Sequence, residues 1–139
     1  MDGLERAKEL LRVGACTCSL VKGEREFTSR ERGVLPLLRL IDSGEDFLGA
    51  FAADKVVGRA AAFLYILIGV SELYASVISE PALNVLRDGG VRVSFSELVP
   101  AIRNRAGTGF CPMETATRAL TSAREAERVI RKTLRELNS

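Results

Sequence analysis

The sequence contains no histidine among its 139 residues. A Ser-His-Asp triad, a Cys-His pair and a His-ligated metal site are therefore excluded, because each of them needs an imidazole. Cysteine is also scarce: Cys16, Cys18 and Cys111 are an odd number in a chain without signs of secretion. We interpret them as free thiols rather than as a disulfide framework.

We also expect neither a secretion signal nor a membrane span. Residues 1–6 contain no apolar segment and no cleavage site of small residues, which predicts a cytoplasmic protein. The longest apolar stretch, residues 56–70, is interrupted by Gly58 and Arg59 and is shorter than the roughly 18 residues that a membrane span needs. We therefore expect a buried helix there and no membrane partner.

No strong charge excess is present, since 20 Lys and Arg residues face 18 Asp and Glu residues. This balance argues against a nucleic-acid partner. Arg124, Arg128, Arg131 and Lys132 crowd the C-terminal region, but glutamates alternate with them, which is typical of a solvated helix with salt bridges. The chain has the length of one domain and shows no repeat or linker, so we predict a single domain over residues 1–139.

Hydrophobic periodicity and turn residues predict the order of the elements. They indicate a surface helix over 2–13, a hairpin with strands over 16–21 and 25–29, a helix over 34–41, a strand over 48–53, a buried helix over 57–68, a strand over 73–78, a short helix over 81–87, a strand over 91–95, a short helix over 98–102 and helix from 111 to the end. Alternating strands and helices favour parallel pairing, and thus an α/β fold.

Three predicted helix starts follow strands, at the edge of the sheet where ligands bind in open α/β folds. They are Asp54–Arg59, Ser79–Pro81 and the loop from Asn104 to Gly109. Freed backbone amides and a helix dipole together form an anion site. Ordinary strand-to-helix turns, with Ser79 as a cap and Pro81 in a first turn, explain the same residues. Both interpretations stay open.

On the ligand-binding interpretation, Lys55 and Arg59 supply charge, and Asp54 and Asn104 supply orientation. Arg59 lies at the positive end of a helix dipole, so we expect a compensating anion beside it, either the carboxylate of Asp54 or Glu80 in a salt bridge or an anionic ligand. The full set of expected ligand-binding residues is Asp54, Lys55, Gly58, Arg59, Ser79, Glu80, Asn104, Arg105, Thr108, Gly109 and Glu114.

Cys111-Pro112-Met113-Glu114 has the pattern of a helix start, with Pro at the first position and Glu at the third. A thiol at a helix N-terminus feels the dipole, which favours the thiolate, and Arg105 is a neighbouring charge. Cys111 is therefore a candidate catalytic nucleophile, although capping alone accounts for these residues.

Several runs of residues, together with the element order, resemble a small prokaryotic family of unknown function with a cytidine-deaminase-like fold. These runs are Gly58 to Ala62, Gly69-Val70, Tyr74-Ala75, Val77 to Ala82, Asn104-Arg105, Gly107 to Gly109 and Cys111 to Glu114. The resemblance extends from about Cys18 to Glu114. It implies a three-layer α/β sandwich, with a mixed sheet of about five strands and helices on both faces.

Zinc deaminases hold the metal with an H-x-E element at the start of the buried helix and a P-C-x-x-C element at the start of the next. Here residues 56–62 offer neither ligand nor carboxylate, and Ser79 to Ala82 contain no cysteine. The resemblance therefore implies the fold without zinc chemistry, and we expect no metal and no cofactor.

Three hypotheses about function remain. In the leading one, the scaffold binds a small anionic or nucleotide-like ligand, such as a nucleotide or a phosphate compound, at helix N-termini. In the second, the protein is a thiol-dependent enzyme that uses Cys111. In the third, it is a non-catalytic interaction module that forms a homo-oligomer such as a homodimer.

Overall fold

The computed structural model describes residues 2–103, 107, 109 and 111–138. Its elements are α1 (Gly3–Val13), β1 (Cys18–Lys22), β2 (Arg25–Ser29), α2 (Leu35–Ser43), β3 (Phe51–Val57), α3 (Arg59–Ile68), β4 (Glu72–Ser79), α4 (Glu80–Asp88), β5 (Arg92–Val99), α5 (Pro112–Thr117) and α6 (Ala123–Leu137). The strands form one sheet in the order β2-β1-β3-β4-β5. β1 is antiparallel to both its neighbours, whereas β3, β4 and β5 are parallel. The predicted α/β fold with a mixed five-stranded sheet is confirmed.

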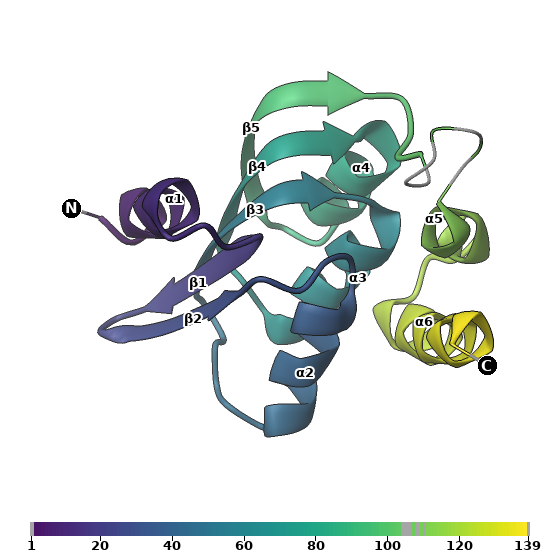
Figure 1. Cartoon of the computed structure of the whole chain (residues 1–139), viewed down its shortest axis with the longest axis horizontal. Helices are drawn as coiled ribbons and strands as arrows, with labels where there is room; N and C mark the ends of the chain where they lie inside the picture. Colours follow the sequence, from purple (N-terminus) through teal and green to yellow (C-terminus); the bar gives the residue numbers. More distant parts are fainter. Residues whose placement is uncertain (1, 104–106, 108, 110, 139) are drawn as a thin grey trace.

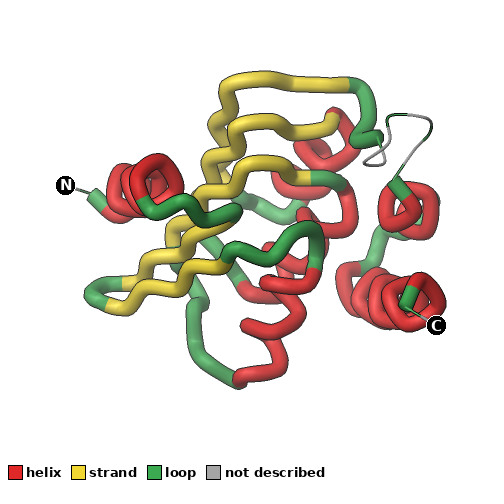
Figure 2. Tube along the Cα trace, viewed as in Figure 1, coloured by secondary structure: helices red, strands yellow, loops and turns green. Residues whose placement is uncertain are grey.

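Helices cover both faces of this sheet (Figure 1). α1 packs on one face, against β1 and β3, while α2, α3 and α4 lie on the other. α5 and α6 pack beside α3, near the ends of the parallel strands, as the helical segments of Figure 2 show. The main core lies between the sheet and the α2–α4 layer, and a smaller cluster around Ala7 and Leu11 holds α1 in place.

α3 is the helix on which the cavity described below depends. Its residues from Ala60 to Tyr65 are all buried, which confirms the prediction of a helix without a polar face. Three consecutive alanines, Ala60 to Ala62, leave little side chain on the first turns, so the helix backbone approaches its neighbours closely.

The predicted boundary between the third strand and this helix is wrong. β3 continues to Val57, because Val56 and Val57 pair with Val77 and Ile78 of β4. Gly58 then adopts an extended conformation as the N-cap of α3. β-branched residues favour the strand, and an apolar run does not by itself distinguish a buried strand from a buried helix. Asp54 and Lys55 consequently belong to a strand, not to a helix start.

The expected short helix over 98–102 is also wrong. Leu98 and Val99 pair with Ile78 and Ser79, so β5 runs to Val99. Pairing with a neighbouring strand is a tertiary interaction that local sequence does not reveal.

The expected continuous C-terminal helix is likewise broken. α5 ends at Thr117, and α6 begins after Ser122, whose hydroxyl accepts a hydrogen bond from the Glu125 amide at 3.3 Å. Ser122 is a conventional N-cap, and this capping signal outweighs the helix propensity of the surrounding residues.

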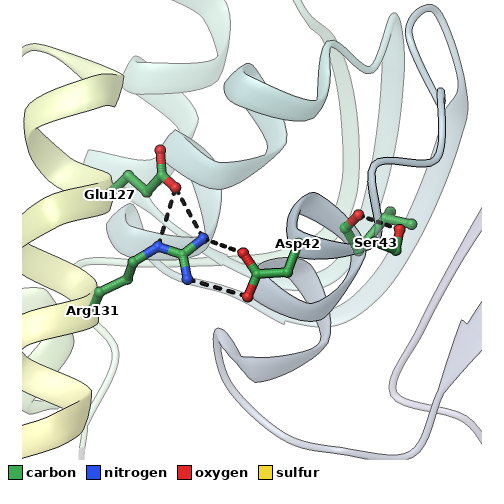
Figure 3. Close-up of polar contacts among 5 residues, drawn as sticks. Asp42, Ser43, Glu127 and Arg131 are labelled. Atoms are coloured by element: carbon green, nitrogen blue, oxygen red, sulfur yellow. Dashed lines mark hydrogen bonds and ion pairs between the residues drawn. The ribbon is translucent and has the colours of Figure 1, made fainter.

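α6 is tied to α2 by an arginine that binds two carboxylates (Figure 3). The guanidinium of Arg131 donates to both oxygens of Asp42, at 2.8 and 3.3 Å, and to Glu127 on its own helix. The hydrogen bond from Arg131 lowers the pKa of Asp42 below its ordinary value. Two elements far apart in the sequence are thereby joined, and α6 also packs against α5.

Candidate functional site

A cavity of about 420 Å³ lies where β3 ends and α3 begins. The arrowheads of β3, β4 and β5 point toward α5, which contributes to the cavity wall (Figure 1). The lining residues are Thr17, Arg32, Gly33, Val34, Asp54, Lys55, Val56, Gly58, Ala60, Ala61, Ile102, Cys111, Met113 and Glu114. This is the edge at which open α/β sheets bind ligands.

Asp54 is a buried carboxyl group in the wall of this cavity, with only 8% of the residue exposed. The Tyr65 hydroxyl donates to one carboxyl oxygen at 2.6 Å, and the Val56 amide donates to the other at 3.2 Å. Burial raises the pKa of Asp54 to about 7, although these hydrogen bonds act to lower it. The carboxyl group is therefore divided between its neutral and charged forms at neutral pH.

Two titratable groups that interact with Asp54 are a thiol and a phenol. Cys18 is its partner across the β1–β3 pair, and Tyr65 reaches it from α3. Burial, followed by the charge of Asp54, raises the pKa of the Cys18 thiol and that of the Tyr65 hydroxyl well above their ordinary values. Both groups remain neutral around pH 7, so neither supplies a charge that would balance Asp54.

Glu114 of α5 places its carboxylate against the first turn of α3. Its two oxygens accept hydrogen bonds from the amides of Arg59 at 2.8 Å and Ala60 at 3.2 Å, and the Ser79 hydroxyl donates to it at 3.4 Å. Gly58 makes this approach feasible, because a Cβ there would lie 2.6 Å from a Glu114 oxygen. The anion at this helix start is thus Glu114, and the expected salt bridge of Arg59 to Asp54 or Glu80 is wrong.

Arg59 turns away from the cavity and binds the other end of α5. Its guanidinium donates to the carbonyl of Thr117 at 2.9 Å and to that of Leu120, and it lies over the ring of Phe63. Helix C-terminal carbonyls attract cations, which compensates the unfavourable place of Arg59 in a first turn. We call the two contacts together, Glu114 on α3 and Arg59 on α5, the α3–α5 clasp.

The structure brings five of the sequence-predicted site residues together around the cavity: Asp54, Lys55, Gly58, Cys111 and Glu114.

The other predicted residues fall into two groups. Arg59, Ser79, Glu80 and Gly109 are described and do not line the cavity. Ser79 is a buried N-cap of α4, and Glu80 is exposed in the first turn of that helix. Asn104, Arg105 and Thr108 lie outside the described residues.

Sequence reasoning did not single out the rest of the cavity wall. The residues concerned are Thr17, Arg32, Gly33, Val34, Val56, Ala60, Ala61, Ile102 and Met113. Thr17 reaches the site because β1 pairs with β3, and its carbonyl accepts a hydrogen bond from the Lys55 amide at 3.0 Å. One signal was available: Tyr65 lies in an apolar helix, and a buried tyrosine hydroxyl needs a partner, which is Asp54.

Two kinds of feature are absent from the part of the chain that the structure describes. No three His, Cys, Asp or Glu side chains come together as a potential metal site. No helix there has both the length and the apolar character that crossing a membrane requires.

Residues 6–134 match the model of the TM1506 family, a domain of unknown function (DUF1893). The crystal structure of a DUF1893 family protein (TM1506) from Thermotoga maritima is similar, with a TM-score of 0.82 and 28% sequence identity. This likeness covers 96% of the present chain and 89% of that one. No curated protein matches the sequence. The predicted resemblance to a family of unknown function is confirmed.

Two deaminases are more distant structural neighbours. The diaminohydroxyphosphoribosylaminopyrimidine deaminase/5-amino-6-(5-phosphoribosylamino)uracil reductase of Thermotoga maritima is 18% identical, with a TM-score of 0.45 over 68% of this chain and 35% of that one. The dCMP deaminase of the cyanophage S-TIM5, in apo form, is 16% identical, with a TM-score of 0.46 over 70% of this chain and 94% of that one. We draw no conclusion about activity from either.

Proposed function

Because the chain belongs to the DUF1893 family, whose function is unknown, we propose a function from the cavity itself: the protein binds a small anionic organic ligand there. Nucleotides and sugar phosphates are the class of ligand that this proposal names.

One observation carries the proposal: two exposed cations share one cavity with an apolar wall. Lys55 and Arg32 both line the cavity, and Lys55 also lines a second hollow, beside Lys8 and Arg12 of α1. Neither cation forms an ion pair with another described residue. Val34, Ile102 and Met113 supply apolar surface beside them. Ligand pockets combine apolar walls with a few polar groups that fix orientation, and their volumes are about 300–1,000 Å³. A guanidinium and an ammonium are the groups that recognise phosphate or carboxylate.

The hydrogen bonds of Glu114 change the expected place of the ligand's anionic group, which the sequence put at helix N-termini. The first amides of α3 already bind Glu114, so an external anion at that helix start would have to compete with a carboxylate of the chain. We therefore assign the anionic group of the ligand to Lys55 and Arg32, and its organic part to the apolar wall.

A thermal-shift screen followed by calorimetry tests this proposal, with inorganic phosphate, ribose 5-phosphate and AMP as probes. A ligand at a hundredfold excess over its Kd stabilises the folded state by about 2.7 kcal/mol, a readily measured shift. The variants Lys55→Met and Arg32→Met should each bind about tenfold more weakly, the effect of one charged hydrogen bond. Lys132→Met, an exposed lysine on α6, is the matched control. The proposal fails if no probe stabilises the wild type, or if the cavity variants bind as the control does.

A thiol-dependent reaction is the second candidate, and the place of Cys111 in the cavity wall is the observation that favours it. Cys111 is also the N-cap of α5. A nucleophilic thiol reacts faster with iodoacetamide at neutral pH than free cysteine does. A rate at or below that of free cysteine removes this candidate.

A further inference from the structure

The cavity wall holds a buried acidic group without an ion-pair partner. Asp54 receives its hydrogen bonds from neutral donors, the Tyr65 hydroxyl and backbone amides. No ion pair joins it to a cation among the described residues, although Lys55 and Arg32 line the same cavity. An ionised carboxylate removed from water without a counter-ion is costly.

Accepting the hydrogen bond from the Tyr65 hydroxyl does not by itself require an acidic side chain at position 54. An asparagine carbonyl accepts a hydrogen bond from a tyrosine hydroxyl equally well, and it carries no charge to desolvate. Asp54 differs from asparagine in two ways: both of its oxygens accept hydrogen bonds, from Tyr65 and from the Val56 amide, and it carries a negative charge, which lies at a cavity. Buried carboxyl groups in clefts with pKa values near neutrality are typical of functional sites.

We propose that Asp54 binds a protonated amine of the ligand while Lys55 and Arg32 bind its anionic group, so that the natural ligand is a small zwitterion. This inference rests on the proposed function, because the same cavity and the same two cations hold the anionic end.

The proposal has a consequence for pH. The titratable and charged groups that face Asp54 or share its cavity are Cys18 of β1, Tyr65 of α3, Glu114 of α5, Cys111 before α5 and the cations Lys55 and Arg32. The Cys18 thiol and the phenol stay neutral because their pKa values are raised. A bound ammonium favours the charged carboxylate, so binding releases a proton from the fraction of Asp54 that is protonated. Affinity for the amine should therefore rise between pH 6 and pH 8.

Two matched probes test this directly: 2-aminoethylphosphonate, and ethylphosphonate, which has the same phosphonate group but no amine. At pH 8 the wild type should bind the amino compound about tenfold more tightly, and this preference should shrink at pH 6. Asp54→Asn should lose the preference and bind the two compounds with about equal affinity. Asp88→Asn, an exposed acid at the end of α4, is the control and should keep the preference.

The outcomes separate the two proposals. If the wild type binds both phosphonates equally, or if Asp54→Asn keeps the preference, Asp54 is not an amine site while the anionic site stands. If neither compound binds, the proposed function fails and this inference fails with it. The comparison of the two probes on the wild type needs no variant, so it decides the question even if Asp54→Asn does not fold.

Discussion

At the scale of single residues, Asp54 has the most unusual environment of the described acids. It is buried, its pKa is raised to about 7, and it opens onto a cavity. Burial is the main cause of this raised pKa. Ionisation of Asp54 therefore destabilises the folded protein when no ligand is bound, which a neutral side chain of the same shape would not do.

This cost predicts a specific dependence of stability on pH. The ordinary aspartate pKa of 3.8 applies to the unfolded chain, and the folded value is higher, so the folded state binds more protons between these two values. The contribution of Asp54 to stability is therefore full below about pH 4 and is lost as the pH rises toward 7. Between pH 5 and pH 8, the wild type should lose about 2–3 kcal/mol of unfolding free energy relative to Asp54→Asn.

Urea unfolding of both proteins at the two pH values measures this difference. Asp88→Asn serves as the control, because the acid that it removes is exposed. A difference between the wild type and Asp54→Asn that stays constant from pH 5 to pH 8 would contradict the raised pKa.

The three thiols should differ in reactivity. Cys16 and Cys18 are buried, and the raised pKa of Cys18 keeps it protonated, whereas Cys111 is half-buried on the cavity wall. Iodoacetamide should therefore label Cys111 first in the folded protein. Peptide mass spectrometry after brief labelling measures the order, and labelling in urea, where all three thiols are exposed, is the control. Labelling of Cys18 as fast as Cys111 would mean that β1 is not packed as described.

At the scale of elements, the α3–α5 clasp explains how a helix as short as α5 is held beside the cavity. α5 has six residues, fewer than an isolated helix needs for stability. Each helix instead caps the other: the carboxylate of Glu114 binds amides of α3, and the guanidinium of Arg59 binds carbonyls at the end of α5.

The contact of Glu114 with α3, one half of the clasp, predicts that the effects of substitutions at Glu114 and Gly58 on stability are coupled. Glu114→Ala should destabilise the fold by about 0.5–2 kcal/mol, the usual effect of losing a helix cap. Gly58→Ala should displace the Glu114 carboxylate, because the new Cβ would overlap it. Gly58→Ala should therefore lower the free energy of unfolding by about 1 kcal/mol more in the wild type than in the Glu114→Ala background. If urea unfolding shows that Gly58→Ala lowers the free energy of unfolding equally in the two backgrounds, the absence of a side chain at Gly58 is not what allows Glu114 to bind α3.

Substitution of Arg59, whose guanidinium forms the other half of the clasp, distinguishes a structural role of this residue from a role in ligand binding. Arg59→Gln loses charged hydrogen bonds to two carbonyls, so the melting temperature should fall, by an amount that corresponds to about 1–3 kcal/mol. Affinity for any cavity ligand should change little. Arg124→Gln, at an exposed position in the first turn of α6, should leave stability near that of the wild type. Unchanged stability of Arg59→Gln, or a selective loss of ligand affinity, would assign Arg59 to the site instead.

Element boundaries also mark the limit of what the sequence predicts. The hairpin, the first two helices and the alternation of strand and helix follow from local patterns, and the structure confirms them. The end of β3 and the end of β5 depend on pairing with β4, which periodicity does not report. Glu114 was expected at the site from its place at a helix start, but its bonds to α3 arise only when α5 packs there.

At the scale of the whole molecule, the topology assembles the cavity from segments that are distant in the sequence. Thr17, Arg32, Lys55 and Glu114 come from different connections and elements, and they meet at the ends of the strands. The sequence predicts this edge as the site because parallel strands place helix starts there. It does not predict Thr17 or Arg32, since their proximity depends on the antiparallel pairing of β1 with β3 and on the path of the chain from β2 to α2.

The central claim is that this cavity binds a small anionic ligand, and a titration followed by ¹H–¹⁵N NMR tests it most directly. Ribose 5-phosphate or AMP is added to the ¹⁵N-labelled protein, and the amide shifts are followed to saturation. We predict saturable shifts in the cavity wall, at Gly33, Lys55, Gly58 and Met113, with little change in α1 on the opposite face of the sheet. The absence of saturable shifts with both compounds, or shifts confined to surfaces outside the cavity, would contradict the claim.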